Sequence, residues 1–153
     1  QVDLVEMEVF QEVQMVLKNL MEIWVETEIL EEIHQQTLIP LLSQVPDDKM
    51  IIIDLANDYP KWVWNIDLTW KRHDGFYGKK WIYSFTPNFG GKHLPTGDMN
   101  MYASGFAEAL NAPNRGNLVG VGSAPEGLDN NDVVYELLAD AAWTSEAVDL
   151  QAL

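Results

Sequence analysis

The chain contains no cysteine among its 153 residues. Without thiols it can form neither a disulfide framework nor a thiolate metal site, and it suits an oxidising or a reducing compartment equally. Histidine is also scarce, since only His34, His73 and His93 are present, and they have no ligand-like spacing. We therefore predict no metal site and no cofactor.

Basic residues are few as well. Nine Lys and Arg stand against 24 Asp and Glu, which gives a formal net charge of −15. Lys71-Arg72 and the nearby pair Lys79-Lys80 do not amount to the basic cluster that phosphate binding requires, so the sequence argues against nucleic-acid binding. The same acidic balance disfavours adhesion to anionic lipid surfaces.

Long apolar runs are missing too. No stretch approaches the roughly 18 residues of a membrane span, and the N-terminal "QVDLVEMEVF" is acidic where a signal peptide would be basic. The chain starts with Gln rather than Met, and we expect it to be a segment of a longer protein. What is present is 47% hydrophobic and 10% aromatic residues, which at this length indicates one globular domain with a single core.

Residues 1–48 differ in character from the rest, because they are rich in acids and contain one lysine, Lys18. Apolar residues recur there at spacings of three and four, which predicts an amphipathic helix: Phe10, Val13, Leu17, Leu20 and Trp24. No proline or glycine interrupts the segment before Pro40. We expect a solvated acidic face over a buried stripe; the alternative is a helix that binds a partner.

Residues 49–143 alternate between strand-like and helix-like segments. The apolar runs "KMIIIDLAND", "KKWIYSFTPNFGG" and "GNLVGVG" predict strands, the first of them buried on both faces. Two segments predict helices, "DMNMYASGFAEALN" with Asp98 as N-cap and "DNNDVVYELLADAAW" with Asp129 or Asn130 as N-cap. Alternating strands and helices favour parallel βαβ units.

Three such strands cannot close a barrel alone, but they suit part of a longer one. We therefore predict an α/β fold that forms about half of a (β/α)8 TIM barrel, preceded by the acidic amphipathic helix. Residues 1–153 would form a single region, in which 144–153 is a tail that leads into a further C-terminal part.

The chemistry of such barrels gathers at the carboxyl ends of the strands. Here those ends carry "DLAND", "TPNFGG" and "GSAPEG". In the last of these, Glu126 stands between Pro125 and Gly127, where a carboxylate could serve as nucleophile or stabiliser toward an oxocarbenium-like centre. The alternative is an acid that favours the dipole of the following helix.

Two further strand ends offer groups for recognising a sugar. Asp54 could orient a substrate hydroxyl or bond backbone groups at its strand end. Asn88 supplies an amide and Phe89 a ring for the C–H face of a sugar; the alternative is a turn with a core Phe. Most tryptophans of the middle region would be packing residues, with one or two available to line a carbohydrate site: Trp62, Trp64, Trp70 and Trp81.

The quoted runs resemble the alpha-N-acetylglucosaminidases of glycoside hydrolase family 89. The similarity lies in "DGFYGKKWIYSFTPNFGGK" (74–92) and "LVGVGSAPEGLDNNDVVYELLADAAW" (118–143), with a less distinctive segment in "LLSQVPDDKMIIIDLANDYPKW" (41–62). The resemblance implies a catalytic (β/α)8 barrel that removes terminal α-linked N-acetylglucosamine with retention of configuration. Family members are lysosomal in animals, where they act on heparan sulfate, and are typically exported in bacteria.

The resemblance also implies roles for single residues. Glu126 matches the catalytic nucleophile of the family. Asn88 and Phe89 match a loop of the sugar pocket, and Asp54 with Leu55 matches another strand end that faces the site. A strand is implied near Trp24.

Two departures from the family pattern leave a second interpretation open. The Phe-x-Glu type motif of the general acid/base does not match "DLVEMEVF", so its expected position lies before Gln1. Thr27-Glu28-Ile29 stands where the family has Gln-Gly-Trp, within the divergent residues 26–39.

The first interpretation is a fragment of a retaining hydrolase, inactive alone, that binds a carbohydrate and pairs with the missing barrel half or with itself. The second is a non-catalytic barrel remnant or interaction protein.

Overall fold

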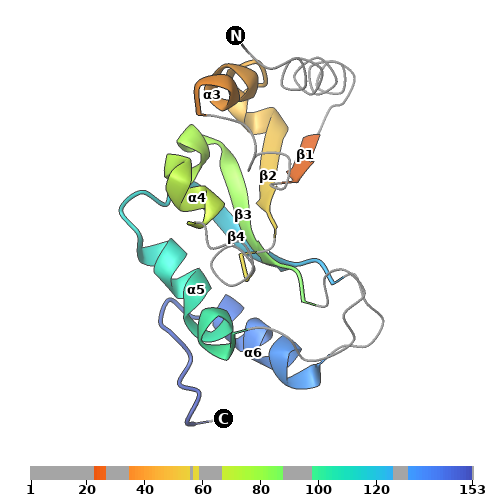
Figure 1. Cartoon of the computed structure of the whole chain (residues 1–153), viewed down its shortest axis with the longest axis vertical. Helices are drawn as coiled ribbons and strands as arrows, with labels where there is room; N and C mark the ends of the chain where they lie inside the picture. Colours follow the sequence, from red (N-terminus) through yellow and green to blue (C-terminus); the bar gives the residue numbers. More distant parts are fainter. Residues whose placement is uncertain are drawn as a thin grey trace.

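The computed structural model describes residues 23–26, 35–55, 57–58, 67–87, 98–125 and 131–152. Within these residues four parallel strands form one sheet in the order β1-β2-β3-β4 (Figure 1). The strands are β1 (Ile23–Glu26), β2 (Met50–Asp54), β3 (Lys80–Phe85) and β4 (Asn117–Ser123). Because the spatial order follows the chain order and every pairing is parallel, each connection returns the chain to the same edge of the sheet.

Helices occupy the connections and the C-terminal part. They are α3 (Gln35–Ser43), α4 (Thr69–Arg72), α5 (Met99–Asn111) and α6 (Asp132–Ala142), with a short 3-10 turn η1 (Asp47–Lys49) before β2. Helices α5 and α6 pack against each other. None of the helices in the described ranges is long and apolar enough to cross a membrane.

The segment after α6 folds back onto α5. Its backbone is held by a hydrogen bond from Val148 N to Ala103 O, at 3.0 Å. The side chain of Asn111, at the end of α5, donates to Ser145 O at 2.8 Å. Residues 145–148 therefore belong to the packed body of the molecule.

The three predicted strands and the two predicted helices of residues 49–143 are all present as β2, β3, β4, α5 and α6. Asp98 caps α5 as predicted, because its side chain accepts a hydrogen bond from Asn100 N at 2.9 Å. The predicted cap of α6 was wrong. The helix begins at Asp132, so the side chain that reaches the free N–H of its second residue, Val133, is that of Asn131, at 3.1 Å.

The N-terminal prediction needs a correction at Trp24. This residue lies in β1, in register with Ile51 of β2, and not in a helix. Pairing with a neighbouring strand satisfies its backbone groups, and this tertiary contact outweighs the local spacing of apolar residues. The strand that the family resemblance implied near Trp24 is confirmed; the rest of the predicted acidic helix lies outside the described residues.

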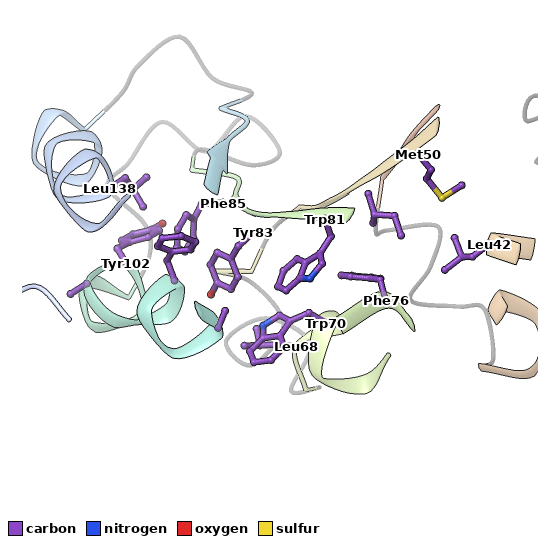
Figure 2. Close-up of a cluster of buried hydrophobic side chains, with 14 of the residues drawn as sticks. Leu42, Met50, Leu68, Trp70, Phe76, Trp81, Tyr83, Phe85, Tyr102 and Leu138 are labelled. Atoms are coloured by element: carbon purple, nitrogen blue, oxygen red, sulfur yellow. The ribbon is translucent and has the colours of Figure 1, made fainter. Parts of the chain in front are cut away.

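Side chains of β2 and β3 alternate between the two faces of the sheet. Ile52, Trp81, Tyr83 and Phe85 point to the face that α4 and α5 cover, and all are buried (Figure 2). Residues of the opposite face, such as Ile51, Ile53 and Ile82, are only partly buried. β2 is therefore fully buried on one face and partly buried on the other, so the prediction that it is buried on both faces is met only in part among the described residues.

The buried face is built from aromatic rings. Ring centroids lie 5.1 Å apart for Tyr83 and Phe85 and 5.3 Å apart for Phe85 and Tyr102, both in edge-to-face contact. Trp70 of α4 stacks on Trp81 at 5.9 Å. Such pairs add to the stabilisation that burial alone provides. Trp70 and Trp81 are thus the packing residues that were predicted, whereas Trp62 and Trp64 lie outside the described residues.

At the amino edge of the sheet, the turn before β3 has left-handed backbone geometry. In this segment, η3 (Asp74–Gly78), the φ angles of Gly75, Phe76 and Tyr77 are 62°, 58° and 54°. Gly75 packs directly on Gly116, whose φ is also positive; a Cβ on Gly75 would lie 2.5 Å from Gly116 N. Both positions therefore require glycine. The side chain of Phe76 fills the core, in edge contact with Trp81 at 5.3 Å.

A buried cation closes the same edge. Lys79 is only 6% exposed, and its Nζ donates to Val45 O and to Asp47 Oδ1, both at 2.5 Å. This side chain ties the start of β3 to the turn that precedes β2. The "GFYGK" part of the family-like sequence thus serves packing at the amino edge, the side of a parallel α/β fold associated with stability.

Candidate active site

The carboxyl ends of β2, β3 and β4 meet at the opposite edge of the sheet. Beyond the last strand residues, Asn57 N donates to Ser84 O at 3.1 Å and Ala124 N donates to Phe85 O at 2.9 Å. These bonds keep the segments that leave the three strands next to one another. The predicted site residues 54–55, 88–89 and 126 belong to these three segments.

Asp54 is the last residue of β2 and is 1% exposed. It lies in register with Tyr83, and strand alternation places it on the same face of the sheet as Ile52, the face covered by α5. Leu55 follows directly and is partly buried. The structure thus brings both to the carboxyl edge, with Asp54 directed to the helical side.

The other predicted site residues, Asn88, Phe89 and Glu126, lie outside the described residues. Their roles stay predictions. The described chain nevertheless reaches Pro87, directly before Asn88, and Pro125, directly before Glu126. The hydrogen bond from Ala124 N to Phe85 O holds these two approaches side by side.

Asn57 replaces the missing ladder where β2 and β3 separate. Its side-chain Nδ2 donates to Asp54 O at 2.7 Å and to Ser84 O at 3.1 Å, and its backbone N–H donates to the same Ser84 oxygen. The residue is 1% exposed, so these bonds satisfy backbone carbonyls that have little access to water. One alternative role predicted for Asp54 was to bond backbone groups at the end of β2. The structure shows Asn57 in this role.

Asp58 joins three elements through one carboxylate. Its Oδ1 accepts from Thr86 N, immediately after β3, and its Oδ2 accepts from the Tyr102 hydroxyl of α5, each at 3.0 Å. Asp58, Thr86 and Tyr102 are 4%, 4% and 1% exposed. Hydrogen bonds to a carboxylate in such a setting are stronger than those between neutral groups.

Burial shapes the electrostatics of this edge. It raises the pKa of the Asp58 carboxyl, an effect that the hydrogen bonds from Thr86 and Tyr102 partly oppose. Burial also raises the pKa of Tyr83 well above its usual value, and the negative charges of Asp54, Asp58 and Glu108 add to this shift. The carboxyl edge is therefore a low-dielectric region with two buried acids beside a neutral phenol.

At the end of β4, Tyr135 of α6 forms a hydrogen bond with Ser123. Ser123 is the last residue of the strand and lies three residues before Glu126. This bond attaches helix α6 to the end of β4, the strand that precedes the predicted nucleophile in the sequence.

Within the described residues, no group of three or more acidic or histidine side chains is arranged to hold a metal ion. His73, near the amino edge, is buried and contacts the Tyr77 hydroxyl through Nδ1 at 3.1 Å. Burial lowers the pKa of its imidazole, and the charge of Arg72 lowers it further.

Sequence reasoning missed Asn57, Asp58 and Tyr102 as members of this edge. A signal for the first two was available in "DLAND", since a second polar pair directly after a buried strand end is well placed to bond strand-end backbone. Tyr102 gave no local signal, because its role depends on a partner 44 residues away in the chain.

Comparisons with known proteins agree with this architecture. The family model described as the alpha-N-acetylglucosaminidase (NAGLU) TIM-barrel domain matches residues 5–145. Human alpha-N-acetylglucosaminidase is 34% identical over 114 residues, which are 73% of this chain and 14% of the human protein. The chain therefore spans only a small part of the curated relative that it matches.

Solved structures give the same result. A family 89 glycoside hydrolase from Clostridium perfringens in complex with PUGNAc matches with a TM-score of 0.59 and 27% identity, over 73% of this chain and 12% of that one. Its complex with 2-acetamido-1,2-dideoxynojirimycin matches with a TM-score of 0.61 and 26% identity, over 79% and 12%.

A third structure supports the fold alone because it is 20% identical. It is a C. perfringens enzyme with two glutamates replaced by glutamine, in complex with its substrate GlcNAc-α-1,4-galactose. The TM-score is 0.71, over 94% of this chain and 15% of that one. With a family model that covers most of its length, the chain belongs to the alpha-N-acetylglucosaminidase TIM-barrel family, glycoside hydrolase family 89.

Proposed function

We propose that this chain is part of a retaining glycoside hydrolase that removes terminal, non-reducing α-linked N-acetylglucosamine. Its four described strands would form about half of the catalytic (β/α)8 barrel. Family membership carries the proposal. One of the C. perfringens structures contains a sugar mimic with a 2-acetamido group. This group is the substituent that distinguishes N-acetylglucosamine from glucose.

In this proposal Glu126 is the nucleophile. It follows β4 by three residues, and parallel barrels carry their chemistry at that end of the strands. The attack of its carboxylate on the anomeric carbon would give a covalent glycosyl-enzyme, which water then hydrolyses. Asn88 and Phe89 would bind the sugar from the neighbouring segment, and Leu55 from the next. Asp54, which is buried on the helical side of the sheet, would support this strand end without touching the sugar.

A retaining mechanism needs a second carboxyl group, about 5 Å from the first, to protonate the leaving oxygen. The segments that resemble the family supply one catalytic glutamate, Glu126. We therefore propose that the general acid comes from outside residues 1–153, and that the complete site forms only in the full-length gene product.

A covalent trap tests the nucleophile. The full-length gene product is incubated with a fluorinated, mechanism-based N-acetylglucosaminyl inhibitor, digested, and examined by mass spectrometry. We expect the sugar on Glu126, and an α-configured first product in an NMR assay of hydrolysis. Labelling of Glu126→Ala to the same extent, or an inverted first product, would reject the proposed mechanism.

A further inference from the structure

The Asp58 carboxylate bonds directly to both the end of β3 and helix α5 at the carboxyl edge. One oxygen accepts from Thr86 N and the other from the Tyr102 hydroxyl, so both carboxylate oxygens are engaged. Thr86 stands two residues before Asn88, at the point where the chain leaves the regular ladder. This contact therefore fixes the backbone of Thr86, directly after β3.

The cost of burying a carboxylate indicates that Asp58 does more than accept a hydrogen bond from one N–H group. Burying a carboxylate is costly, and a neutral amide could accept from Thr86 equally well. Only a carboxylate can accept from the Thr86 N–H and the Tyr102 hydroxyl at once, one on each oxygen, without a competing donor of its own. The arrangement fixes Thr86 relative to α5 more tightly than a single hydrogen bond would.

We propose that Asp58 is a positioning residue for sugar binding: through Thr86 and Tyr102 it fixes the end of β3, from which the chain continues to Asn88 and Phe89. This inference rests on the proposed function, in which these two residues contact the N-acetylglucosamine. Asp58 contacts neither the substrate nor Glu126 in this account. Its loss should therefore weaken substrate binding more than it slows the chemical step, which raises KM while kcat changes little.

A matched pair of tyrosine variants provides the test. Tyr102→Phe removes the hydroxyl that donates to Asp58, whereas Tyr83→Phe removes a similarly buried hydroxyl that donates to Met101 Sδ at 3.7 Å. Hydrolysis of an aryl α-N-acetylglucosaminide by the full-length gene product gives kcat and KM for each. We expect KM to rise about fivefold for Tyr102→Phe and by less than about twofold for Tyr83→Phe, with kcat within about threefold in both.

Asp58→Ala, which removes both contacts, should raise KM by about tenfold or more, and Asp58→Asn should fall between the wild type and Asp58→Ala. Dissociation constants for 2-acetamido-1,2-dideoxynojirimycin, measured by calorimetry, should rise in the same order. If Asp58→Ala does not fold, the tyrosine pair decides the question.

The outcomes separate two failures. An active wild type, with Tyr102→Phe and Tyr83→Phe lowering Tm equally and leaving KM unchanged, would overturn the positioning role and leave the proposed function intact. An equal fall in kcat and kcat/KM for Tyr102→Phe would also overturn it, because the loss would lie in the transition state. A wild type that does not hydrolyse α-N-acetylglucosaminides would overturn the proposed function, and with it this inference.

Discussion

The two edges of the sheet are stabilised by different interactions. At the amino edge, Gly75 and Gly116 bring two backbones into direct contact, and Phe76 closes the core beside them. At the carboxyl edge, Asn57 and Asp58 bond backbone and hydroxyl groups where the strands separate. The family-like segments therefore differ in role: "GFYG" serves packing, whereas "NFGG" and "PEG" follow the strand ends where chemistry is expected.

This division predicts that amino-edge variants change stability and spare substrate binding. The largest effect is expected for Gly75→Ala, because its Cβ would lie 2.5 Å from Gly116 N and its φ is 62°. We expect unfolding free energy to fall by about 3 kcal/mol or more, measured by denaturant titration.

Gly78→Ala is the matched control. It has a φ of 90° but nothing within 4 Å of the added Cβ, so only the backbone cost of about 1–2 kcal/mol applies. KM of the folded protein should not change for either variant. Equal losses at both glycines would show that the close contact between Gly75 and Gly116 contributes nothing.

A smaller loss is expected for Lys79→Met. The substitution leaves Val45 O without the Nζ donor, at a cost of about 1–3 kcal/mol. Asp47 is exposed, so the ion pair itself contributes little.

Lys49→Met removes an exposed ion pair with Asp48 and should cost less than about 0.5 kcal/mol. Thermal denaturation of the two variants tests the difference. A Tm for Lys79→Met as high as that of Lys49→Met would contradict the role of Lys79 in closing the amino edge.

The smallest effect concerns pH. The pKa of Asp58 is raised in the folded state, chiefly by burial, so folding favours its protonated form. Its contribution to stability is full below the unfolded pKa of about 3.9 and is lost as pH rises through the folded pKa. The stability of Asp58→Asn, which stays neutral, should therefore increase relative to that of the wild type as the pH rises above about 4.

Denaturant titration at several pH values measures this gain, with Asp48→Asn as an exposed control. A difference between Asp58→Asn and the wild type that does not change with pH would show that burial does not perturb Asp58.

The sequence was sufficient to predict the regular elements whose signal is local. β2, β3, β4 and α5 follow from apolar runs and from the Asp98 cap, although β3 ends at Phe85, before the Gly90-Gly91 that closes its predicted run. Trp24 was placed in a helix because the spacing of apolar residues was weighed without the neighbouring strand that its backbone pairs with. Such pairing is a non-local contact, and a single sequence does not contain it.

The sequence predicted where the carboxyl edge lies, but not which hydrogen bonds connect its segments. Strand ends rich in polar residues indicated where a site would lie, and Asp54 is buried there. The bond between Asp58 and Tyr102 joins residues far apart in the chain, and the left-handed turn at Gly75 depends on contact with Gly116. Both are consequences of packing between segments that no local pattern relates.

We propose that catalysis takes place at the carboxyl edge of the sheet, with Glu126 as the nucleophile. The most direct measurement is kcat/KM for an aryl α-N-acetylglucosaminide in the full-length gene product, with Glu126→Gln compared with Glu108→Gln on α5. We predict a loss of about 10³-fold or more for Glu126→Gln, less than about twofold for Glu108→Gln, and a Tm within about 2 °C of the wild type for both. Activity of Glu126→Gln within tenfold of the wild type would contradict the account.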